Sequence, residues 1–300
     1  MLISSKYIYL PPKRRSFFPK VYFSIIKKLI KTEWYIRVNI NYYYRLFFKR
    51  NSLRQNKICI LFPSKNRPEK LGRLLDSLIN KTKFKNRVKI LISLDENEKK
   101  KIEYEKIKNI YESKGLFIKY QFKNCSSHSE RVTLLANKYK DEDLYFFVGD
   151  DFVFVLENWD TYLDFIESKT DRNKPFSIWT RSNIYHEKYY YLHSDCPIVN
   201  RYWFEKLGYI GGKFTNNGLM KTPNGFEDTW TCELGRLTKK FIVTKIFILD
   251  HINAFFPGNS NEWDEVAENR KLEKEEDFFG PWLKTKDIRK QEAKKLLNKF

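Results

Sequence analysis

The chain has 300 residues, 42% of them hydrophobic, and its 57 Lys and Arg against 37 Asp and Glu give a formal net charge of +20. A chain of this length can bury one sizeable core, so we expect one domain with appendages. The positive charge favours polyphosphate, nucleic acid or an anionic membrane as a partner. The four cysteines form no Cys-x-x-Cys pair, which argues against a zinc site or a disulfide framework and favours a reducing compartment.

Residues 1–57 carry much of the positive charge, with fourteen Lys or Arg against the single acid Glu33. Aromatic residues and isoleucines lie between these basic residues, a mixture typical of segments that rest on anionic lipid. A helical extension that packs on the main domain, with its lysines solvated, would have the same composition. We therefore expect residues 1–56 to form a basic, aromatic-rich, helical N-terminal extension with one of these two roles.

The sequence also indicates where the protein resides. It contains no run of about 18 uncharged apolar residues, the length that a membrane span needs. The early Lys13-Arg14-Arg15 is not followed by the apolar region of a secretory signal. We expect a cytoplasmic protein, peripheral on the inner membrane surface if residues 1–56 bind lipid.

From Lys57 onward, short apolar runs alternate with helical patterns. This alternation predicts an α/β fold with a mixed, mostly parallel sheet that is covered by helices on both faces. The predicted strands are residues 58–62, 88–94, 116–122 and 144–148. A helical spacing of leucines from Leu71 to Ile79 follows the first strand, so the chain there is strand, loop and helix.

Polar residues follow each of these predicted strands. In open α/β sheets, ligands bind at the carboxyl ends of the strands, so these residues should converge on one crevice. They are Ser64, Asn66, Arg67, Asp95, Asp150 and Asp151. No Gly-x-Gly-x-x-Gly follows the first strand and no Gly-Lys-Ser/Thr loop occurs, which argues against a dinucleotide-binding fold and a P-loop nucleotidase.

The pair Asp150-Asp151 directly follows an apolar run that ends at Val148. Two adjacent carboxylates at a strand end are hard oxygen ligands that suit Mg²⁺ or Mn²⁺ bridging to substrate phosphates. The alternative is a turn with solvated aspartates. Apolar residues on both sides of the pair favour the metal, because buried like charges need compensation.

In their order along residues 57–258, these motifs resemble the family 2-like glycosyltransferases with the GT-A (Rossmann-like) fold. The loop from Pro63 to Pro68 resembles the family's first-strand loop, which receives the nucleotide base and ribose. Asp95 lies where the family has an aspartate that contacts the nucleoside. Gly149-Asp150-Asp151 resembles the DxD metal motif, although Gly149 stands where a strict DxD has its first aspartate, so the residues leave open which aspartate ligates the metal.

Glu227-Asp228 matches the family's xED motif at the start of a helix. The resemblance implies that Asp228 is the general base, that Glu227 orients the acceptor, and that the anomeric carbon is inverted in a single displacement. Helix capping is the alternative, because acids near a helix N-terminus interact favourably with its dipole.

Two further residues complete the predicted site. His251 follows an apolar strand, and a neutral imidazole there would complete a Mn²⁺ shell. The resemblance supports this, because many GT-A enzymes have a metal-binding histidine after the xED helix and the strand that follows it. Arg131 lies near the start of a predicted helix and is suited to phosphate contact. The predicted donor-binding residues are thus Pro63, Ser64, Asn66, Arg67, Asp95, Arg131 and Asp150, and the predicted metal ligands are Asp150, Asp151 and His251.

These observations predict a GT-A domain over residues 57–258 and a charged helical C-terminal extension over 259–300. The expected activity is metal-dependent, inverting transfer of a sugar from a nucleotide-diphosphate sugar to a hydroxyl of a glycan or lipid-linked acceptor. Two other functions stay open. The first is a nucleic-acid-directed polymerase, because Gly-Asp-Asp is also the metal-binding hairpin of RNA-dependent RNA polymerases, although the chain is short for one. The second is a basic membrane-surface or nucleic-acid-binding protein, which would leave the strand-end acids without a purpose.

Overall fold

A computed structural model describes residues 55–125, 127–181, 194–212, 227–251 and 285–298. Residues 1–54 of the predicted N-terminal extension lie outside the described residues, as do the side chains of Glu227 and His251. No helix in the described part of the chain is long and apolar enough to cross a membrane.

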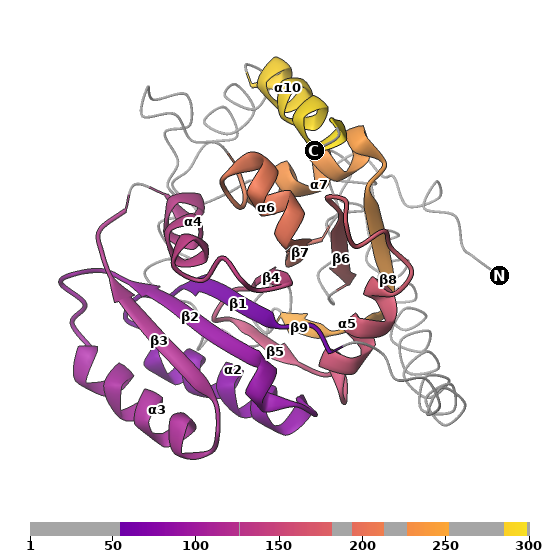
Figure 1. Cartoon of the computed structure of the whole chain (residues 1–300). Helices are drawn as coiled ribbons and strands as arrows, with labels where there is room; N and C mark the ends of the chain where they lie inside the picture. Colours follow the sequence, from indigo (N-terminus) through magenta and orange to yellow (C-terminus); the bar gives the residue numbers. More distant parts are fainter. Residues whose placement is uncertain (1–54, 126, 182–193, 213–226, 252–284, 299–300) are drawn as a thin grey trace, which may run out of the picture.

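The described residues form a seven-stranded sheet in the order β3-β2-β1-β4-β7-β6-β8 (Figure 1). β7 runs antiparallel to both of its neighbours, and the other pairs are parallel. The strands of this sheet are β1 (Ile58–Pro63), β2 (Val88–Leu94), β3 (Phe117–Phe122), β4 (Leu144–Phe147), β6 (Ser177–Arg181), β7 (Pro197–Asn200) and β8 (Phe241–Phe247). The predicted mixed, mostly parallel sheet is therefore confirmed, and the four predicted strands agree with β1 to β4 to within one residue at each end.

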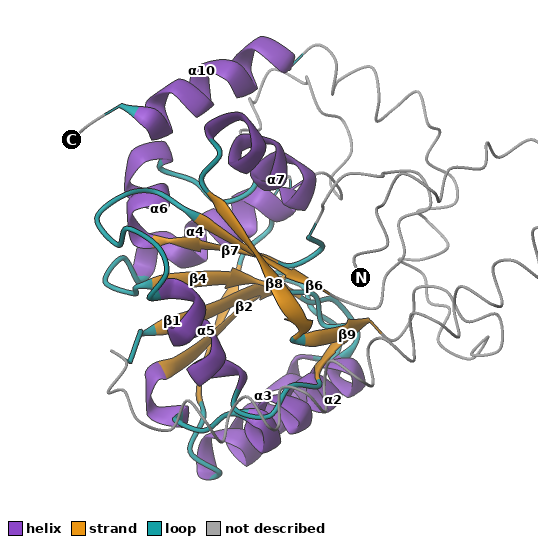
Figure 2. Cartoon of the chain, turned by 90° about the vertical axis from the view of Figure 1, so that its right-hand side faces the viewer, coloured by secondary structure: helices purple, strands orange, loops and turns teal. Residues whose placement is uncertain are grey.

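Helices cover both faces of the sheet, as Figure 2 shows. On one face, α2 (Pro68–Lys81), α3 (Lys101–Ser113) and α5 (Trp159–Glu167) pack against Ile58, Ile60 and Phe62. On the other face, α4 (His128–Lys138), α6 (Arg201–Leu207), α7 (Glu227–Thr238) and α10 (Lys286–Leu297) pack against Cys59 and Leu61. Because both faces of β1 are buried, the strand is apolar throughout instead of alternating.

Two short strands form a separate sheet beside the main one. β5 (Phe152–Phe154) pairs antiparallel with β9 (Leu249–His251), and Phe152 lies opposite His251 in this register. A single 3₁₀ turn, η2 (Lys85–Arg87), precedes β2. The small sheet thus places β9, which follows β8 in the chain, beside the segment that follows β4.

α10 belongs to the segment over which we predicted a charged helical extension. Its residues Ala293 and Leu296 are buried in one cluster with Trp230 and Leu234 of α7. The Arg289 guanidinium also lies 5.6 Å from the centre of the Trp230 ring. The described part of this segment is thus a charged helix whose apolar face adds to the core, and the domain boundaries themselves stay predictions.

A buried ionic cluster joins the start of β1 to η2 and α5. Arg87 donates to Asp164 Oδ1 and Oδ2 at 2.8 and 2.7 Å and to Asp160 Oδ2 at 2.7 Å. The backbone and side-chain nitrogens of Asn56 donate to Asp164 Oδ1 at 3.0 and 2.8 Å. Asp160 and Asp164 are 0% and 2% exposed, so Arg87 is their charge compensation in a region with little water.

Replacing Arg87 should therefore destabilise the fold strongly. Arg87→Ala leaves two buried carboxylates without their cation, and we expect the free energy of unfolding to fall by about 3–5 kcal/mol. Lys290→Ala is the matched control, because Lys290 pairs with Asp287 at 3.3 Å on the surface and such pairs contribute about 0–1 kcal/mol. Urea unfolding of both variants checks this; equal losses would contradict the structural role of the cluster.

Candidate functional site

The carboxyl ends of β1, β2 and β4 meet at one edge of the sheet, because β1 lies between the other two and all three are parallel. Ser64 follows β1 and its hydroxyl donates to Asp150 Oδ2, after β4, at 2.7 Å. Arg67 Nε lies 3.4 Å from the same oxygen. The structure thus brings the predicted donor loop and the predicted acidic pair into direct contact.

The loop from Ser64 to Arg67 is held by residues that the sequence did not single out. The backbone N–H of Asn66, which has a left-handed φ of 53°, donates to both carboxylate oxygens of Glu98 at 3.2 and 3.1 Å. The backbone N–H of Arg67 donates to the Tyr104 hydroxyl at 3.0 Å. Pro68 then opens α2 at a position where its missing N–H costs nothing, so the loop has a fixed length between β1 and the helix.

Asp95 lies beside this loop and forms ion pairs with two cations. Lys65 Nζ lies 3.3 Å from Asp95 Oδ2, and Arg131, in the first turns of α4, donates to Asp95 Oδ1. Partial burial raises the pKa of Asp95, but the hydrogen bond and charge of Arg131, together with Lys65, outweigh it and lower that pKa below its ordinary value. Asp95 is therefore ionised and keeps two cationic side chains at this edge of the sheet.

Asp150 is the most enclosed acid of the site, with 2% of its surface exposed. The pKa of Asp150 is raised to about 6: burial and the charge of Asp151 raise it, and the charges of Arg67 and Lys70 and the hydrogen bond from Ser64 lower it. A carboxylate this deep in the protein, with a second one next to it, favours a nearby positive charge. A divalent cation would supply such a charge.

Gly149 makes room for the second aspartate. A Cβ atom at residue 149 would lie 2.5 Å from Asp151 Oδ1 and 3.2 Å from the Phe152 ring. The Asp151 carboxylate thus folds back over the place where a strict DxD motif would put a side chain. A side chain at residue 149 would therefore require the Asp151 carboxylate to move.

The two carboxylates fit Mg²⁺ or Mn²⁺, which proteins often bind through one or two carboxylates plus substrate phosphates and water. Among the described side chains, no three His, Cys, Asp or Glu residues are grouped closely enough to hold a metal by themselves. The backbone of His251 lies beside the pair, opposite Phe152, but its side chain is outside the described residues. The protein atoms would thus supply part of a coordination shell.

Asp228 lies in the first turn of α7 and accepts from Thr229 N and Oγ1 at 2.6 and 3.2 Å. Its charge also acts on Cys196, which directly precedes β7. Burial raises the pKa of the Cys196 thiol well above its ordinary value, and the charges of Asp195, Asp151 and Asp228 raise it further. Asp228 and Asp151 thus both act electrostatically on the same thiol.

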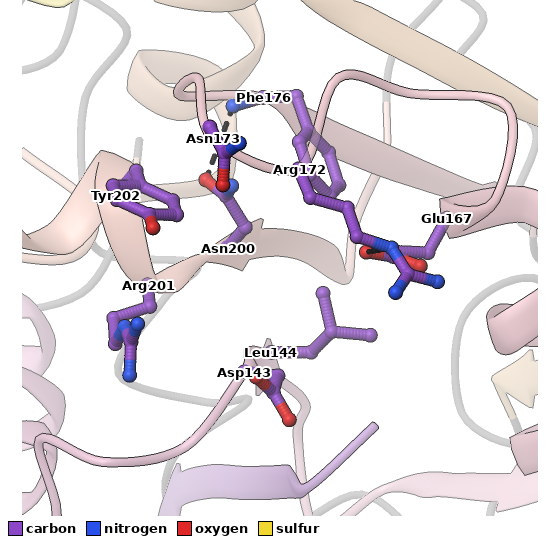
Figure 3. Close-up of a pocket in the computed structure, with 9 residues that line it drawn as sticks. All are labelled: Asp143, Leu144, Glu167, Arg172, Asn173, Phe176, Asn200, Arg201 and Tyr202. Atoms are coloured by element: carbon purple, nitrogen blue, oxygen red, sulfur yellow. Dashed lines mark hydrogen bonds and ion pairs between the residues drawn. The ribbon is translucent and has the colours of Figure 1, made fainter. Parts of the chain in front are cut away.

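One small pocket lies at the opposite end of the sheet, where β4 begins and β7 ends (Figure 3). It is lined by Asp143, Leu144, Glu167, Arg172, Asn173, Phe176, Asn200, Arg201 and Tyr202. Two contacts join lining residues: Arg172 pairs with Glu167 at 2.7 Å, and Asn200 Oδ1 accepts from Phe176 N at 3.1 Å. None of the predicted site residues lines this pocket, so it is separate from the predicted donor site.

The topology also bears on the polymerase alternative. A polymerase Gly-Asp-Asp lies in a hairpin, so the strands on either side of it would pair with each other. Here β4 pairs with β1 and β7, while β5 pairs with β9. The Gly-Asp-Asp of this chain instead leaves the end of a strand in a mostly parallel sheet.

No family model matches the chain, and no curated protein does. Among solved structures, the mannosyltransferase PcManGT from Pyrobaculum calidifontis, in complex with GDP-Man and Mn²⁺, matches with a TM-score of 0.50 at 10% identity, over 91% of this chain and 85% of that one. TarS from S. aureus, as its fragment 1–349, matches with a TM-score of 0.50 at 14% identity, over 77% of this chain and 73% of that one. The match to the same fragment in complex with UDP spans 60% of that chain. The chain therefore has the GT-A fold of glycosyltransferases.

Proposed function

We propose that this protein is a metal-dependent, inverting glycosyltransferase that moves a sugar from a nucleotide-diphosphate sugar to a hydroxyl of a glycan or lipid-linked acceptor. The contact that carries this proposal is the one between Ser64, Arg67 and Asp150, which unites the loop after β1 with the acids after β4. Such a group can bind a nucleotide diphosphate and its cation together. The similarity in fold to PcManGT, whose structure contains GDP-Man and Mn²⁺, supports the proposal.

Cationic side chains at the site are suited to a diphosphate. The Lys65 side chain is 56% exposed, so its ion pair with Asp95 is weak and can be exchanged for a phosphate oxygen at little cost. Arg67 and Arg131 are more enclosed, and a guanidinium can donate two parallel hydrogen bonds to a phosphate. Asp95 keeps Lys65 and Arg131 at this edge before the donor arrives.

In the proposed reaction, Asp228 accepts the proton of the acceptor hydroxyl as that oxygen attacks the anomeric carbon. The bond from the anomeric carbon to the diphosphate oxygen breaks, and attack from the opposite face inverts the configuration. Asp150 and Asp151 would hold Mn²⁺ or Mg²⁺, which would supply the counter-charge for the departing diphosphate.

The place of the reaction in the cell is also a proposal. We infer a cytoplasmic enzyme that contacts the inner membrane surface through residues 1–56. The basic and aromatic composition of that segment supports this, and it would bring the site close to a lipid-linked acceptor.

Removal of the acidic pair should abolish donor use. With Mn²⁺ and a panel of nucleotide sugars, we expect the wild-type protein to release nucleoside diphosphate, and the double variant Asp150→Ala, Asp151→Ala to do so at least ~100-fold more slowly. The control is Asp171→Ala, Asp287→Ala, which removes two exposed carboxylates outside the site. Equal rates for the wild-type protein and the Asp150, Asp151 variant would rule out the metal assignment.

Replacement of the proposed base should separate binding from transfer. Asp228→Asn keeps the size of the side chain but cannot take the acceptor proton, so transfer should slow by about 10²–10⁴-fold. The donor dissociation constant, measured by calorimetry, should stay the same. Asp195→Asn alters another carboxylate near Cys196 and should keep near-normal transfer. Normal transfer by Asp228→Asn would refute the role of Asp228.

A side chain at residue 149 should weaken cation binding. Gly149→Ala places a methyl group against Asp151 Oδ1 and displaces that carboxylate, so Mn²⁺ affinity should fall by about tenfold. Gly72→Ala is the matched control, because the new Cβ meets only the Ile107 side chain, at 4.0 Å. Paramagnetic resonance of free Mn²⁺ measures both affinities. Equal affinities would show that the carboxylate of Asp151 does not need this space.

A further inference from the structure

Helix α3 contributes a buried hydroxyl to the site. Tyr104, in the first turns of α3, is 0% exposed, and its hydroxyl lies 2.7 Å from Ser64 Oγ. Ser64 Oγ in turn donates to Asp150 Oδ2 at 2.7 Å. We propose that Tyr104 is a positioning residue that orients the Asp150 carboxylate, through Ser64, for the cation and the donor diphosphate. This inference rests on the proposed function and adds a residue to its site.

The direction of the hydrogen bonds follows from the groups that are present. Ionised Asp150 is an acceptor only, so Ser64 uses its single proton in the bond to Asp150. Ser64 Oγ must then accept in its bond to Tyr104, and Tyr104 is the donor. The Tyr104 oxygen itself accepts from the backbone N–H of Arg67 at 3.0 Å. The chain of donors therefore runs one way, from Arg67 N–H through Tyr104 and Ser64 to Asp150.

Tyr104 is well suited to this task, because its hydroxyl stays protonated and its position is restrained by contacts with Tyr120. Burial raises the pKa of Tyr104 above its ordinary value, more than its hydrogen bonds lower it, so the phenol keeps its proton at neutral pH. The Tyr120 hydroxyl donates to the Tyr104 carbonyl oxygen at 2.7 Å, and the two rings meet edge to face with centroids 6.0 Å apart. Tyr120 of β3 thus contacts Tyr104, and Tyr104 in turn binds the backbone of Arg67 in the loop after β1.

Two consequences follow for the site. Oδ2 of Asp150 contacts both the Ser64 hydroxyl, at 2.7 Å, and Arg67 Nε, at 3.4 Å, so two groups of the loop hold this oxygen. The same phenol also fixes the backbone of Arg67, and hence the start of α2. Tyr104 therefore sets the donor loop and the acidic pair relative to each other, which a residue that only filled the core would not do.

The test compares two tyrosines of one helix. Tyr104→Phe removes the donor to Ser64. Tyr111→Phe, also in α3, removes a hydroxyl that donates to Gly72 O at 3.0 Å and interacts with Asp76, a carboxylate outside the proposed site. Each full-length variant is titrated with Mn²⁺ alone and with Mn²⁺ plus UDP or GDP, followed by paramagnetic resonance. We expect Mn²⁺ to bind about tenfold more weakly to Tyr104→Phe, within the range usual for residues that orient metal ligands, and unchanged to Tyr111→Phe.

A second variant separates positioning from loss of stability. Ser64→Ala breaks the same chain at its middle, so it should weaken Mn²⁺ binding to a similar extent. The Tyr104→Phe, Ser64→Ala double variant should then be no worse than Ser64→Ala, because both changes remove one pathway. If Tyr104→Phe does not fold by circular dichroism, unchanged Mn²⁺ affinity in a folded Ser64→Ala protein overturns the proposal.

The outcomes distinguish this inference from the proposed function. If the wild-type protein binds Mn²⁺ and nucleotide and Tyr104→Phe binds them equally well, the positioning role is wrong and the proposed function stands. If the wild-type protein binds no Mn²⁺ with or without nucleotide, the proposed function fails, and the inference fails with it. Equal weakening by Tyr104→Phe and Tyr111→Phe indicates a general effect on α3 and also overturns the inference.

Discussion

The burial of one carboxylate constrains the rest of this site. Asp150 is 2% exposed at the end of β4, and removing an ion from water costs several kcal/mol unless other groups compensate. The described compensation comes from Ser64 and Arg67, in a loop 86 residues earlier in the sequence. The loop must therefore be polar and must lie in one position, and Glu98 and Tyr104 hold it there. An ionised group at a strand end has in this way determined the conformation of its neighbours.

The sheet order makes these contacts possible. β1 is central, with β2 on one side and β4 on the other, so its loop reaches both Asp95 and Asp150. β7 lies next to β4 and runs antiparallel, so the start of β7, preceded by Cys196, lies at the same edge as the end of β4. The pairing of β9 with β5 returns the chain to the acidic pair once more. Each of these segments reaches the site because of strand order and direction, independently of its distance along the chain.

Much of this frame was predictable, because it depends on local patterns. β1 to β4 are continuous apolar runs that end in polar residues, and the rule that ligands bind at the carboxyl ends of parallel strands then groups Ser64, Asp95 and Asp150. Tyr104 was not predictable, because it lies on the helix face that also holds Ile107 and Tyr111, a spacing that indicates core packing. Its hydroxyl has a role only through contacts between elements that are distant in sequence.

The partners of charged residues were likewise not predictable from the sequence. Arg131 was expected to contact phosphate, and in the structure it pairs with Asp95, the acid expected to contact the nucleoside. The two predicted roles therefore belong to one ion pair, and a change at either residue alters the other.

Gly149 departs from the DxD pattern, and the structure shows what lies in its place: the Asp151 carboxylate occupies the space that a side chain at residue 149 would fill. The two aspartates consequently differ: Asp150 is enclosed and fixed by neighbouring donors, whereas Asp151 is more exposed and lies toward Cys196. Asp150 therefore offers an oxygen held by its neighbours, and Asp151 adds a second, more accessible carboxylate; Mg²⁺ or Mn²⁺ is often bound by one or two carboxylates together with substrate phosphates.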